Sequence, residues 1–240
     1  MKKRGSRSRP FGKQLTDGLR VQGRGVWTLN SDSGNTVYGE SVRRIGKEEW
    51  RRWDPHRSKL GAGLQRTSGN LTEILPSAGS RILYLGAGHG TTVSHLHDLV
   101  CGEDNHLGGR ILAVDLAPRC LRDLNHLAST RKGLVPLLAD ARRHNEIAAI
   151  MPYRVDWLFQ DVAQASQVEI FLAACKRFLK SNGLGLFSLK AASERWDEEG
   201  ERALFTKVAI TLEESGLDLV ESIELAGFEE HHMLFVCRRS

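Results

Sequence analysis

The stretch R-I-L-Y-L-G-A-G-H-G, Arg81–Gly90, decides the fold predicted for this chain. Its apolar start is of the kind found in a strand that is covered on both faces. It ends in three alternating glycines, Gly86, Gly88 and Gly90. Glycine permits tight turns and a close approach of backbone to ligand, and Thr91 and Thr92 then open a helix whose N–H groups can face a polar cofactor. An ordinary βα turn has the same order, so this pattern alone leaves both interpretations open.

Three further apolar runs each end in an acid: R-I-L-A-V-D at Asp115, L-V-P-L-L-A-D at Asp140 and V-D-W-L-F-Q-D at Asp161. Asp115 stands about 25 residues beyond the glycine loop, near where nucleotide-binding βαβ units place an acid for ribose hydroxyls. Ligands of open parallel α/β sheets lie beyond the carboxyl ends of the strands. We therefore expect the glycine loop and the three acids to meet at one edge of a sheet.

The C-terminal half continues the alternation of helices and strands. A helix is expected near Gln167–Lys180, followed by the apolar strand Gly183–Lys190 with a lysine at its end. A second helix is expected over Glu201–Gly216 with a glycine stop. Leu217–Leu225 and Met233–Cys237 then read as two closing strands, antiparallel if the residues between them reverse tightly.

This order predicts an α/β fold with the doubly wound sheet of S-adenosylmethionine-dependent methyltransferases and an antiparallel terminal hairpin. Asp115 and Asp140 suit the ribose and the adenine amine of that cofactor. An NAD enzyme is the second choice on topology, because no sixth crossover strand of a dinucleotide fold is apparent. Lys190 borders the expected cofactor edge, which favours a functional role for it.

The composition is that of a soluble globular protein, with a net charge of +5 and a pI of about 9.2. The basic excess favours a polyanionic partner such as RNA. Four cysteines without CxxC or His/Cys spacing indicate reduced core thiols rather than disulfides or a zinc site: Cys101, Cys120, Cys175 and Cys237. No apolar segment has the length of a membrane helix and no leader is evident, so we expect a cytoplasmic protein without a membrane partner.

The chain before the methyltransferase domain divides into two parts. Residues 1–20 are basic and rich in Gly and Ser, which predicts a disordered tail that either grips phosphates or is a solubilising or expression-derived segment. Residues 21–50 hold two strand-like runs about a Ser/Asp/Gly/Asn turn, which predicts a small β hairpin module from Gly25 onward. The methyltransferase domain is then expected over residues 51–240.

The segment W-D-P-H-R-S-K-L-G-A links the two domains. With Asp54 as N-cap and Pro55 in the first turn, Arg57, Ser58 and Lys59 fall at the start of a helix, where ligands often lie. Spacing alone also fits Lys59 as a solvated helix lysine.

At this point the residues resemble the fibrillarin family of RNA ribose 2′-O-methyltransferases, in its shorter archaeal form. The resemblance runs from V-Y-G-E at Val37–Glu40 to H-M-L-F-V at His232–Val236. Several of its strings are specific to that family, above all the S-K-L block at Ser58–Leu60, G-T-T-V-S-H at Gly90–His95 and D-V-A-Q at Asp161–Gln164.

Carried over by position, the resemblance implies a set of residues that hold S-adenosylmethionine: the glycine loop with Thr91 and Thr92, Asp115, Leu116, Asp140, Ala141, Asp161, Val162, Ala163 and Gln164. It also implies a catalytic set and no metal: Lys59, Asp161, Lys190 and, beside them, His232. A hydrogen-bonded histidine at a sheet edge is an equally good account of His232.

The chemistry of methyl transfer is consistent with this catalytic set. Transfer from a sulfonium to a ribose hydroxyl is an in-line displacement, so positioning supplies much of the gain. The hydroxyl must also lose its proton, and Lys190 can take it only in the neutral form. A second cation at Lys59 and partial burial favour that form, while Asp161 opposes it and fixes the geometry.

The sequence also departs from the family pattern. An arginine usually follows the second catalytic lysine closely, whereas here the nearest arginine after Lys190 is Arg195. The candidate RNA contacts are Arg195 and, near Lys59, Arg57. Asp115 stands where glutamate is common, and His89 is unusual in the glycine loop. The N-terminal module is shorter than in typical archaeal relatives, and the basic tail has no clear counterpart in them.

The resemblance implies guide RNA and target rRNA or tRNA as partners, together with a Nop-type scaffold protein and a kink-turn-binding protein of a box C/D ribonucleoprotein. The chain shows no RRM or KH signature, which agrees with delegated specificity. A stand-alone RNA 2′-O-methyltransferase and a non-catalytic subunit of an RNA particle remain as alternatives. A small-molecule methyltransferase is the least favoured.

Overall fold

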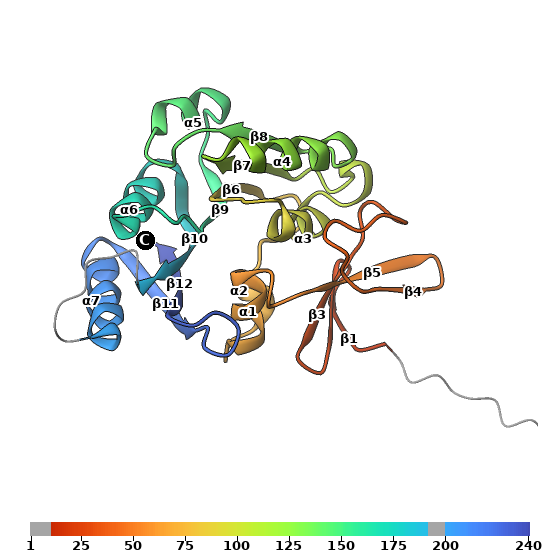
Figure 1. The fold of residues 1–240 in the computed structure, drawn as a ribbon, viewed down its shortest axis with the longest axis horizontal. Helices are drawn as coiled ribbons and strands as arrows, with labels where there is room; N and C mark the ends of the chain where they lie inside the picture. Colours follow the sequence, from red (N-terminus) through yellow and green to blue (C-terminus); the bar gives the residue numbers. More distant parts are fainter. Residues whose placement is uncertain (1–10, 192–199) are drawn as a thin grey trace, which may run out of the picture.

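The protein is built around two sheets in the computed structural model, which describes residues 11–191 and 200–240 (Figure 1). The smaller sheet comes first in the chain and packs against helices α1 (Lys59–Arg66) and α3 (Thr91–Val100). The larger sheet carries the strand-end residues singled out in the sequence. The strand β6 (Arg81–Leu85), followed by the glycine loop, lies inside it.

The larger sheet has seven strands within the described residues, in the order β11-β12-β10-β9-β6-β7-β8. Besides β6, they are β7 (Arg110–Asp115), β8 (Leu134–Leu138), β9 (Val155–Gln160), β10 (Leu179–Lys190), β11 (Leu217–Glu224) and β12 (His232–Arg239). The strands β6 to β10 run parallel, and β12 is antiparallel to both of its neighbours. The predicted α/β sheet with an antiparallel terminal hairpin is therefore confirmed.

Helices cover both faces of this sheet. Besides α1 and α3, the described helices are α2 (Leu71–Ile74), the 3₁₀ turn η1 (Glu103–Asn105), α4 (Pro118–Thr130), α5 (His144–Ile150), α6 (Gln167–Phe178) and α7 (Glu201–Glu214). Along β6, Ile82 and Tyr84 enter the core shared with α1 and α3, while Leu83 and Leu85 enter the core shared with α6. Burial on both faces explains why this strand is continuously apolar. None of the described helices is long and apolar enough to cross a membrane.

The smaller sheet is antiparallel and five-stranded within the described residues, in the order β1-β2-β3-β5-β4. Its strands are β1 (Lys13–Thr16), β2 (Leu19–Gln22), β3 (Gly25–Leu29), β4 (Val42–Ile45) and β5 (Glu48–Trp53). The module thus extends beyond the predicted range 21–50 at both ends, and the tail predicted over residues 1–20 is wrong from Lys13 onward. Leu19 is buried and Val21 packs beside the same core, so apolar alternation outweighs the basic composition here. Residues 1–10 lie outside the described residues.

The predicted hairpin from Gly25 to Glu40 is also wrong. The strand β3 pairs with β2 and β5, and the run beginning at Val37 is a loop. The N–H groups of Val37 and Tyr38 donate to the carboxylate of Glu40, at 3.1 and 2.9 Å. Backbone donors bound in this way are not available to a strand ladder.

Helix α1 starts later than predicted. Ser58, not Asp54, is its N-cap, and the Ser58 hydroxyl accepts from the Gly61 N–H at 3.0 Å. The Asp54 carboxylate instead accepts from the His56 N–H at 3.0 Å, in a local turn ahead of the helix. Lys59 therefore occupies the first helical position.

The four cysteines are buried and free, as predicted. Burial raises the pKa of Cys101 and Cys237 to about 12, so both are protonated thiols near neutral pH.

Candidate active site

The glycine loop after β6 adopts a backbone that only glycine takes easily. Gly86, Gly88 and Gly90 have φ values of 82°, 58° and 91°. A Cβ on Gly86 would lie 2.3 Å from the carbonyl oxygen of Asp161, so this glycine is required by the close approach of the chain after β9. The loop leads directly into Thr91 at the start of α3, where free helical N–H groups are expected.

Asp115, at the end of β7, is hydrogen-bonded to the glycine loop. One carboxylate oxygen accepts from the Gly88 N–H at 2.8 Å and the other from the Ala117 N–H at 2.9 Å. Each oxygen keeps a further lone pair for a ligand hydroxyl. Leu116 follows with 56% of its surface exposed, which places an apolar side chain beside the acid.

Asp140 lies at the same edge after β8, and its charge is stabilised by Arg142. The Arg142 guanidinium and backbone N–H donate to the Asp140 carboxylate, and these hydrogen bonds hold the pKa of Asp140 well below its usual range. Gln164 donates to the same carboxylate at 3.1 Å. The two predicted segments Asp140–Ala141 and Asp161–Gln164 therefore meet in space. Within them Ala141 and Val162 are buried, while Ala163 is exposed.

Lys59 and Asp161, which are far apart in sequence, form an ion pair at 2.9 Å. Their side chains are 24% and 18% exposed, so the pair is partly desolvated but still reachable from solvent. The Asp161 N–H donates to the Leu85 carbonyl at 2.8 Å, which fixes the acid beside β6. The hydroxyls of Ser58 and Thr92 lie 2.8 Å apart and join the N-terminus of α1 to that of α3.

Lys190 and His232 are cross-strand neighbours on β10 and β12. The pairing of β10 with β9 places Phe187 opposite Gln160, so Lys190 extends about two residues beyond the level of Asp161, on the order of 7 Å. The backbone N–H of Lys190 donates to the side-chain oxygen of Gln167, and Lys190 itself is exposed. The structure thus brings Lys59, Asp161 and Lys190 to one edge of the sheet.

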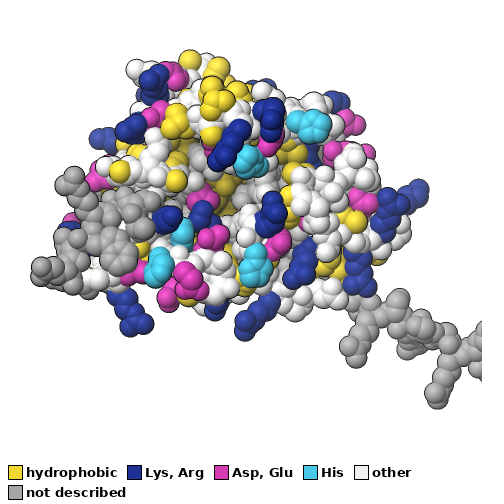
Figure 2. Space-filling model, in the orientation of Figure 1, with side chains coloured by type: hydrophobic (Ala, Val, Ile, Leu, Met, Phe, Trp, Pro, Cys, Tyr) yellow, Lys and Arg dark blue, Asp and Glu magenta, His cyan; other side chains and the backbone are white. Residues whose placement is uncertain are grey.

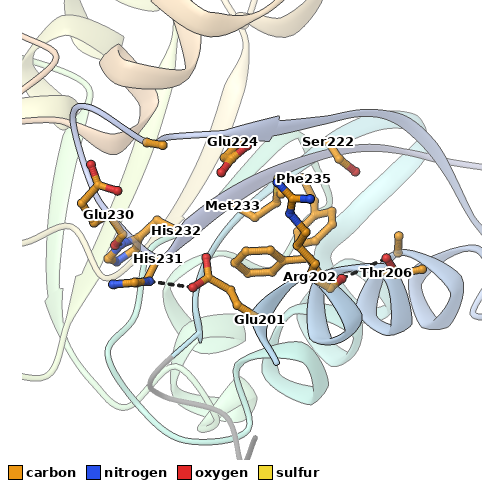
Figure 3. Close-up of a pocket in the computed structure, with 13 residues that line it drawn as sticks. Glu201, Arg202, Thr206, Ser222, Glu224, Glu230, His231, His232, Met233 and Phe235 are labelled. Carbon is orange, nitrogen blue, oxygen red and sulfur yellow. Dashed lines mark hydrogen bonds and ion pairs between the residues drawn. The ribbon is translucent and has the colours of Figure 1, made fainter. Parts of the chain in front are cut away.

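His232 is 7% exposed, and its Nδ1 lies 2.7 Å from the Glu230 carbonyl, so Nδ1–H is the donor. This agrees with the expectation of a hydrogen-bonded sheet-edge histidine and leaves the Nε2 atom for another contact. His232 also lines a cavity of about 850 Å³ between α7 and the closing strands. The neighbouring His231 and Glu201 also line this cavity and contact each other at 2.6 Å; Figure 3 shows the two side chains joined by a dashed line.

The two predicted RNA contacts differ in what the structure says of them. Arg57 is exposed and its guanidinium stacks over Tyr38, 5.5 Å from the ring centroid. It lines a second cavity, of about 870 Å³, which His89 and Thr91 also border. Arg195 lies outside the described residues.

Sequence reasoning missed two side chains beside this edge. Tyr84 is buried under it, and burial together with the charge of Asp161 raises the pKa of its hydroxyl well above the usual range. His89, noted only as unusual, contacts Asp123 on α4 at 2.7 Å. A tyrosine inside an aliphatic strand was the available signal for the first, whereas nothing in the spacing connects His89 to Asp123.

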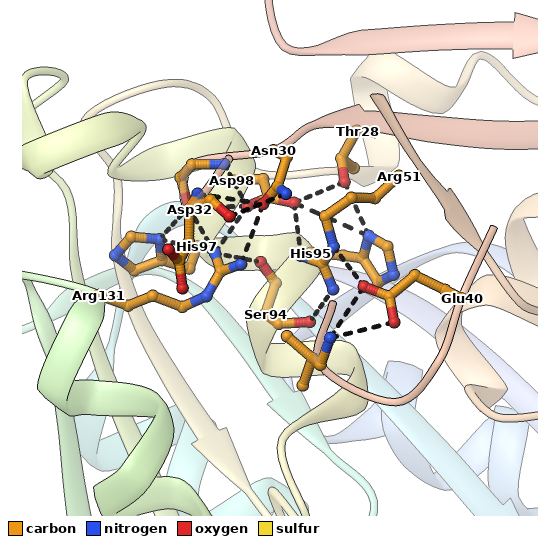
Figure 4. Close-up of polar contacts among 12 residues, drawn as sticks. Thr28, Asn30, Asp32, Glu40, Arg51, Ser94, His95, His97, Asp98 and Arg131 are labelled. Carbon is orange, nitrogen blue, oxygen red and sulfur yellow. Dashed lines mark hydrogen bonds and ion pairs between the residues drawn. The ribbon is translucent and has the colours of Figure 1, made fainter. Parts of the chain in front are cut away.

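Sequence reasoning also missed a buried ionic cluster between the small sheet and α3 (Figure 4). Asp98 lies at its centre and accepts from Arg51 at 2.8 Å and Arg131 at 2.7 Å. Arg51 also bonds Glu40 at 2.5 Å, and all four side chains are fully buried. Burial opposes the charge on Asp98, but the two arginines outweigh burial and hold its pKa well below the usual range.

Two histidines complete this cluster. His95 bridges Thr28 and Tyr38 at 2.7 Å each, and His97 bridges Ser31 and the Lys132 carbonyl at 2.9 Å each. Burial lowers the pKa of His97 to about 4 and holds that of His95 well below its usual range, so both rings are neutral near pH 7. The charged members of the cluster therefore balance.

The fibrillarin family model matches residues 19–240. The chain belongs to the fibrillarin family. A relative from Thermococcus gammatolerans, a fibrillarin-like rRNA/tRNA 2′-O-methyltransferase, is 41% identical over 214 residues, which is 89% of this chain and 90% of the relative.

Two solved fibrillarin structures are similar over most of their length. Aeropyrum pernix fibrillarin, solved with natively bound S-adenosyl-L-methionine, is 34% identical with a TM-score of 0.76, covering 89% of this chain and 88% of that one. A chain of a fibrillarin/Nop5p complex is 30% identical with a TM-score of 0.80, covering 95% of this chain and 100% of that one. The fibrillarin fold is therefore present from the small sheet to the terminal hairpin.

Proposed function

We propose that this fibrillarin-family chain transfers a methyl group from S-adenosylmethionine to the 2′-hydroxyl of ribose in rRNA and tRNA. The observation that carries the proposal is that the Lys59–Asp161 ion pair and Lys190 lie at the same edge of the sheet, beside the glycine loop. The name of the Thermococcus gammatolerans relative and the cofactor bound to the Aeropyrum pernix protein support the same reaction.

The residues at this edge fit S-adenosylmethionine. Asp115 and Asp140 supply carboxylates for the ribose hydroxyls and the adenine amine, and Leu116 supplies an exposed apolar surface for the base. The N-terminus of α3 at Thr91 and Thr92, with the segment Asp161–Gln164, completes the site. When bound, the cofactor supplies an electrophilic methyl group on its sulfonium. Within the described residues, no group of three or more His, Cys, Asp or Glu is arranged for a metal ion.

Lys190 takes the proton from the 2′-hydroxyl in this mechanism. It can do so only as a neutral amine, and the charge of Asp161 would oppose that form if it were unpaired. The ammonium group of Lys59 compensates the charge of Asp161 and also fixes the acid beside the glycine loop. Most of the remaining gain comes from holding the 2′-oxygen in line with the methyl group, to which His232 contributes from the neighbouring strand.

The target is selected by a guide RNA in this proposal, within a box C/D ribonucleoprotein that includes a Nop-type scaffold and a kink-turn-binding protein. The similarity to a chain of the fibrillarin/Nop5p complex over 95% of this chain supports the scaffold. Arg57 and Arg195 are the proposed contacts to target RNA near the reacting ribose. The protein is proposed to act in the cytoplasm.

Transfer of labelled methyl to RNA tests the proposal. The purified chain is assayed alone, with guide RNA only, and with guide RNA plus both proteins, against a target RNA and a matched RNA that carries a single 2′-deoxy nucleotide at the guided position. We expect label only in the complete reaction and only with the ribose target. Label on the 2′-deoxy RNA would refute ribose transfer. Efficient transfer by the chain alone would instead support the stand-alone enzyme.

A further inference from the structure

The small N-terminal sheet has one face that points away from the methyltransferase sheet. Cross-strand pairs place Arg20 opposite Trp27 and Trp27 opposite Arg52, and the next row places Arg43 opposite Trp50. Residues that are directly opposite in a sheet lie on the same face. These five side chains therefore share a surface, which we call, together with Phe11 that lies over it, the aromatic–arginine face.

The other face of the same sheet is already occupied. Val26 and Trp53 enter the core that includes α1 and α3, and Arg51 enters the buried ionic cluster. On the aromatic–arginine face, Arg43 and Arg52 are exposed, Arg20 and Trp27 are half-buried, and Trp50 and Phe11 are buried beneath the arginines.

Arginine side chains stack on the aromatic rings of this face. The guanidinium of Arg20 lies 4.7 Å from the Trp50 ring centroid, and that of Arg43 lies 4.5 Å from the Phe11 ring centroid. Phe11 in turn meets Trp27 edge to face at 5.0 Å. Stacking orients a guanidinium while leaving the N–H groups at its rim available for a ligand, such as the oxygens of a phosphate.

The arginines do not have equal roles. Arg20 is half-buried and donates to the Phe11 carbonyl and to Gln14, so it holds the segment before β1 in place. Arg43 and Arg52 are exposed. The hydrogen bond of Arg43 to Gln22 is long, at 3.4 Å. Arg43 and Arg52 are therefore the members of the face that can bind a ligand without loss of structure.

The surroundings of the face are basic. Lys and Arg side chains gather over the small sheet in Figure 2. Among residues 11–53, the basic side chains outnumber the acidic ones also when the buried Arg51, Glu40 and Glu49 are left out: the remaining basic residues are Lys13, Arg20, Arg24, Arg43, Arg44, Lys47 and Arg52, and the remaining acidic ones are Asp17, Asp32 and Glu48. Glu48, on the same face, accepts from the Trp50 indole N–H at 3.0 Å.

We propose that the aromatic–arginine face binds the phosphate backbone of RNA, outside the edge where methyl transfer takes place. Exposed arginines that are oriented by stacking on aromatic rings can bind the phosphates of RNA without reading its sequence. The face belongs to the small sheet, whereas Lys190 belongs to β10 of the larger one. The inference rests on the proposed function, because it assumes an RNA substrate. It adds a second surface that binds this RNA.

Fluorescence anisotropy with labelled RNA tests this inference on the full chain. The variant is Arg43→Ala/Arg52→Ala, and the matched control is Lys132→Ala/Lys180→Ala, which removes two exposed cations elsewhere. We expect the first variant to bind RNA about tenfold more weakly and to lower the slope of log Kd against log salt by about 1 to 2. The control should change affinity less than about twofold. Arg43→Lys/Arg52→Lys should recover part of the affinity and most of the salt slope, since it keeps the charge but not the planar fork.

Single-stranded and duplex RNA of equal length separate the two forms of the same ligand. An equal loss for both supports contacts to phosphates alone, and a larger loss for the single strand supports added stacking of bases on the guanidinium planes of Arg43 and Arg52. Wild-type affinity and salt slope for both forms would overturn the inference, and so would unchanged RNA binding with weakened binding of the scaffold protein.

Methyl transfer distinguishes this inference from the proposed function. Arg43→Ala/Arg52→Ala should raise the KM for RNA and leave kcat and the affinity for S-adenosylmethionine unchanged. If transfer to ribose proceeds with a wild-type KM in the variant, the face has no part in RNA binding although the enzyme stands. If no transfer occurs in any protein, the proposed function fails first.

Discussion

Two groups of charged side chains lie close to helix α3, and they differ in how completely their charges are satisfied. On the side of α3 that faces the small sheet, Asp98 receives hydrogen bonds from Arg51, Arg131, Thr28 and Ser31. Its ion pairs with the two arginines are fully buried. At the open edge of the larger sheet, the side chains of the Lys59–Asp161 ion pair are about one-fifth exposed. The Asp98 carboxylate has no capacity left for a ligand, while the open group can bind one.

This difference follows from what each group does. A buried charge must be paired and hydrogen-bonded or it costs several kcal/mol, so the cluster around Asp98 serves to join the small sheet to the domain. An open edge tolerates incomplete pairing because water completes it. Changes in the buried cluster should therefore affect stability, and changes at the open edge should affect chemistry.

Lys190→Ala gives the largest expected effect. Loss of the general base should lower kcat for methyl transfer by about 10²–10⁴-fold, while the free energy of unfolding should change by no more than about 0.5 kcal/mol because the residue is exposed. Single-turnover methyl transfer and urea unfolding measure the two quantities. A variant that unfolds easily, or one that retains wild-type turnover, would contradict the division between the two groups.

Asp98→Asn tests the opposite case. It leaves Arg51 and Arg131 without their shared buried counter-ion, so we expect unfolding to become easier by about 3–5 kcal/mol. The exposed pair of Asp104 with Lys132 supplies the control, since Asp104→Asn should leave the urea midpoint unchanged. At a temperature where Asp98→Asn is folded, its kcat should equal that of the wild type, and a large loss there would give the cluster a role in catalysis.

The pH dependence of stability sharpens the comparison further. The pKa of His97 is about 4 in the folded protein, below its unfolded value near 6.5, so the unfolded state binds more protons between these values. The contribution of His97 to stability is full above pH 6.5 and is lost as the pH drops towards 4, which amounts to about 2 kcal/mol between pH 7 and pH 5. The buried His95, whose pKa is also lowered, adds to the fall in the same direction. Urea unfolding at the two pH values should show a smaller fall in His97→Asn, which cannot be protonated there. The exposed His126 is the control, because His126→Gln should keep the wild-type fall.

Arg142→Ala should have the smallest effect. The arginine is exposed and stabilises the charge of Asp140 without contacting the Lys59–Asp161 pair. We expect S-adenosylmethionine to bind at most about fivefold more weakly, with an unchanged melting temperature, since exposed ion pairs contribute little. Isothermal titration of the cofactor gives the affinity. A loss of binding altogether would mean that Asp140 depends on Arg142 far more than an exposed pair allows.

Much of the open edge could be predicted from the sequence. Gly86, Asp115, Asp140 and Asp161 each follow an apolar strand, and parallel strands bring their carboxyl ends to one side of a sheet. Lys190 was found in the same way. These residues were visible because regular alternation of strands and helices converts positions in the sequence into positions in space.

The N-terminal region was predicted less well, for a local reason. The strands β1 and β2 carry basic residues, which suggested disorder, but Leu19 and Val21 pack against the core. The run after Val37 has the composition of a strand, but the carboxylate of Glu40 accepts hydrogen bonds from its backbone N–H groups. In the first place a long-range contact outweighed the local composition, and in the second a side chain two to three residues further on bound the backbone N–H groups that a strand would need.

The sequence by itself determined the family, the α/β sheet and the residues at its functional edge, because these depend on apolar periodicity and on motifs at strand ends. Only the tertiary structure decided which charges pair. Lys59 pairs with Asp161, which is 102 residues away in the sequence, and Arg131, just after α4, pairs with Asp98 on α3. An ion pair depends on distance and burial and leaves no periodic trace in the sequence, so the partners of Asp98 and the stacking of Arg43 on Phe11 became visible only when the chain was folded.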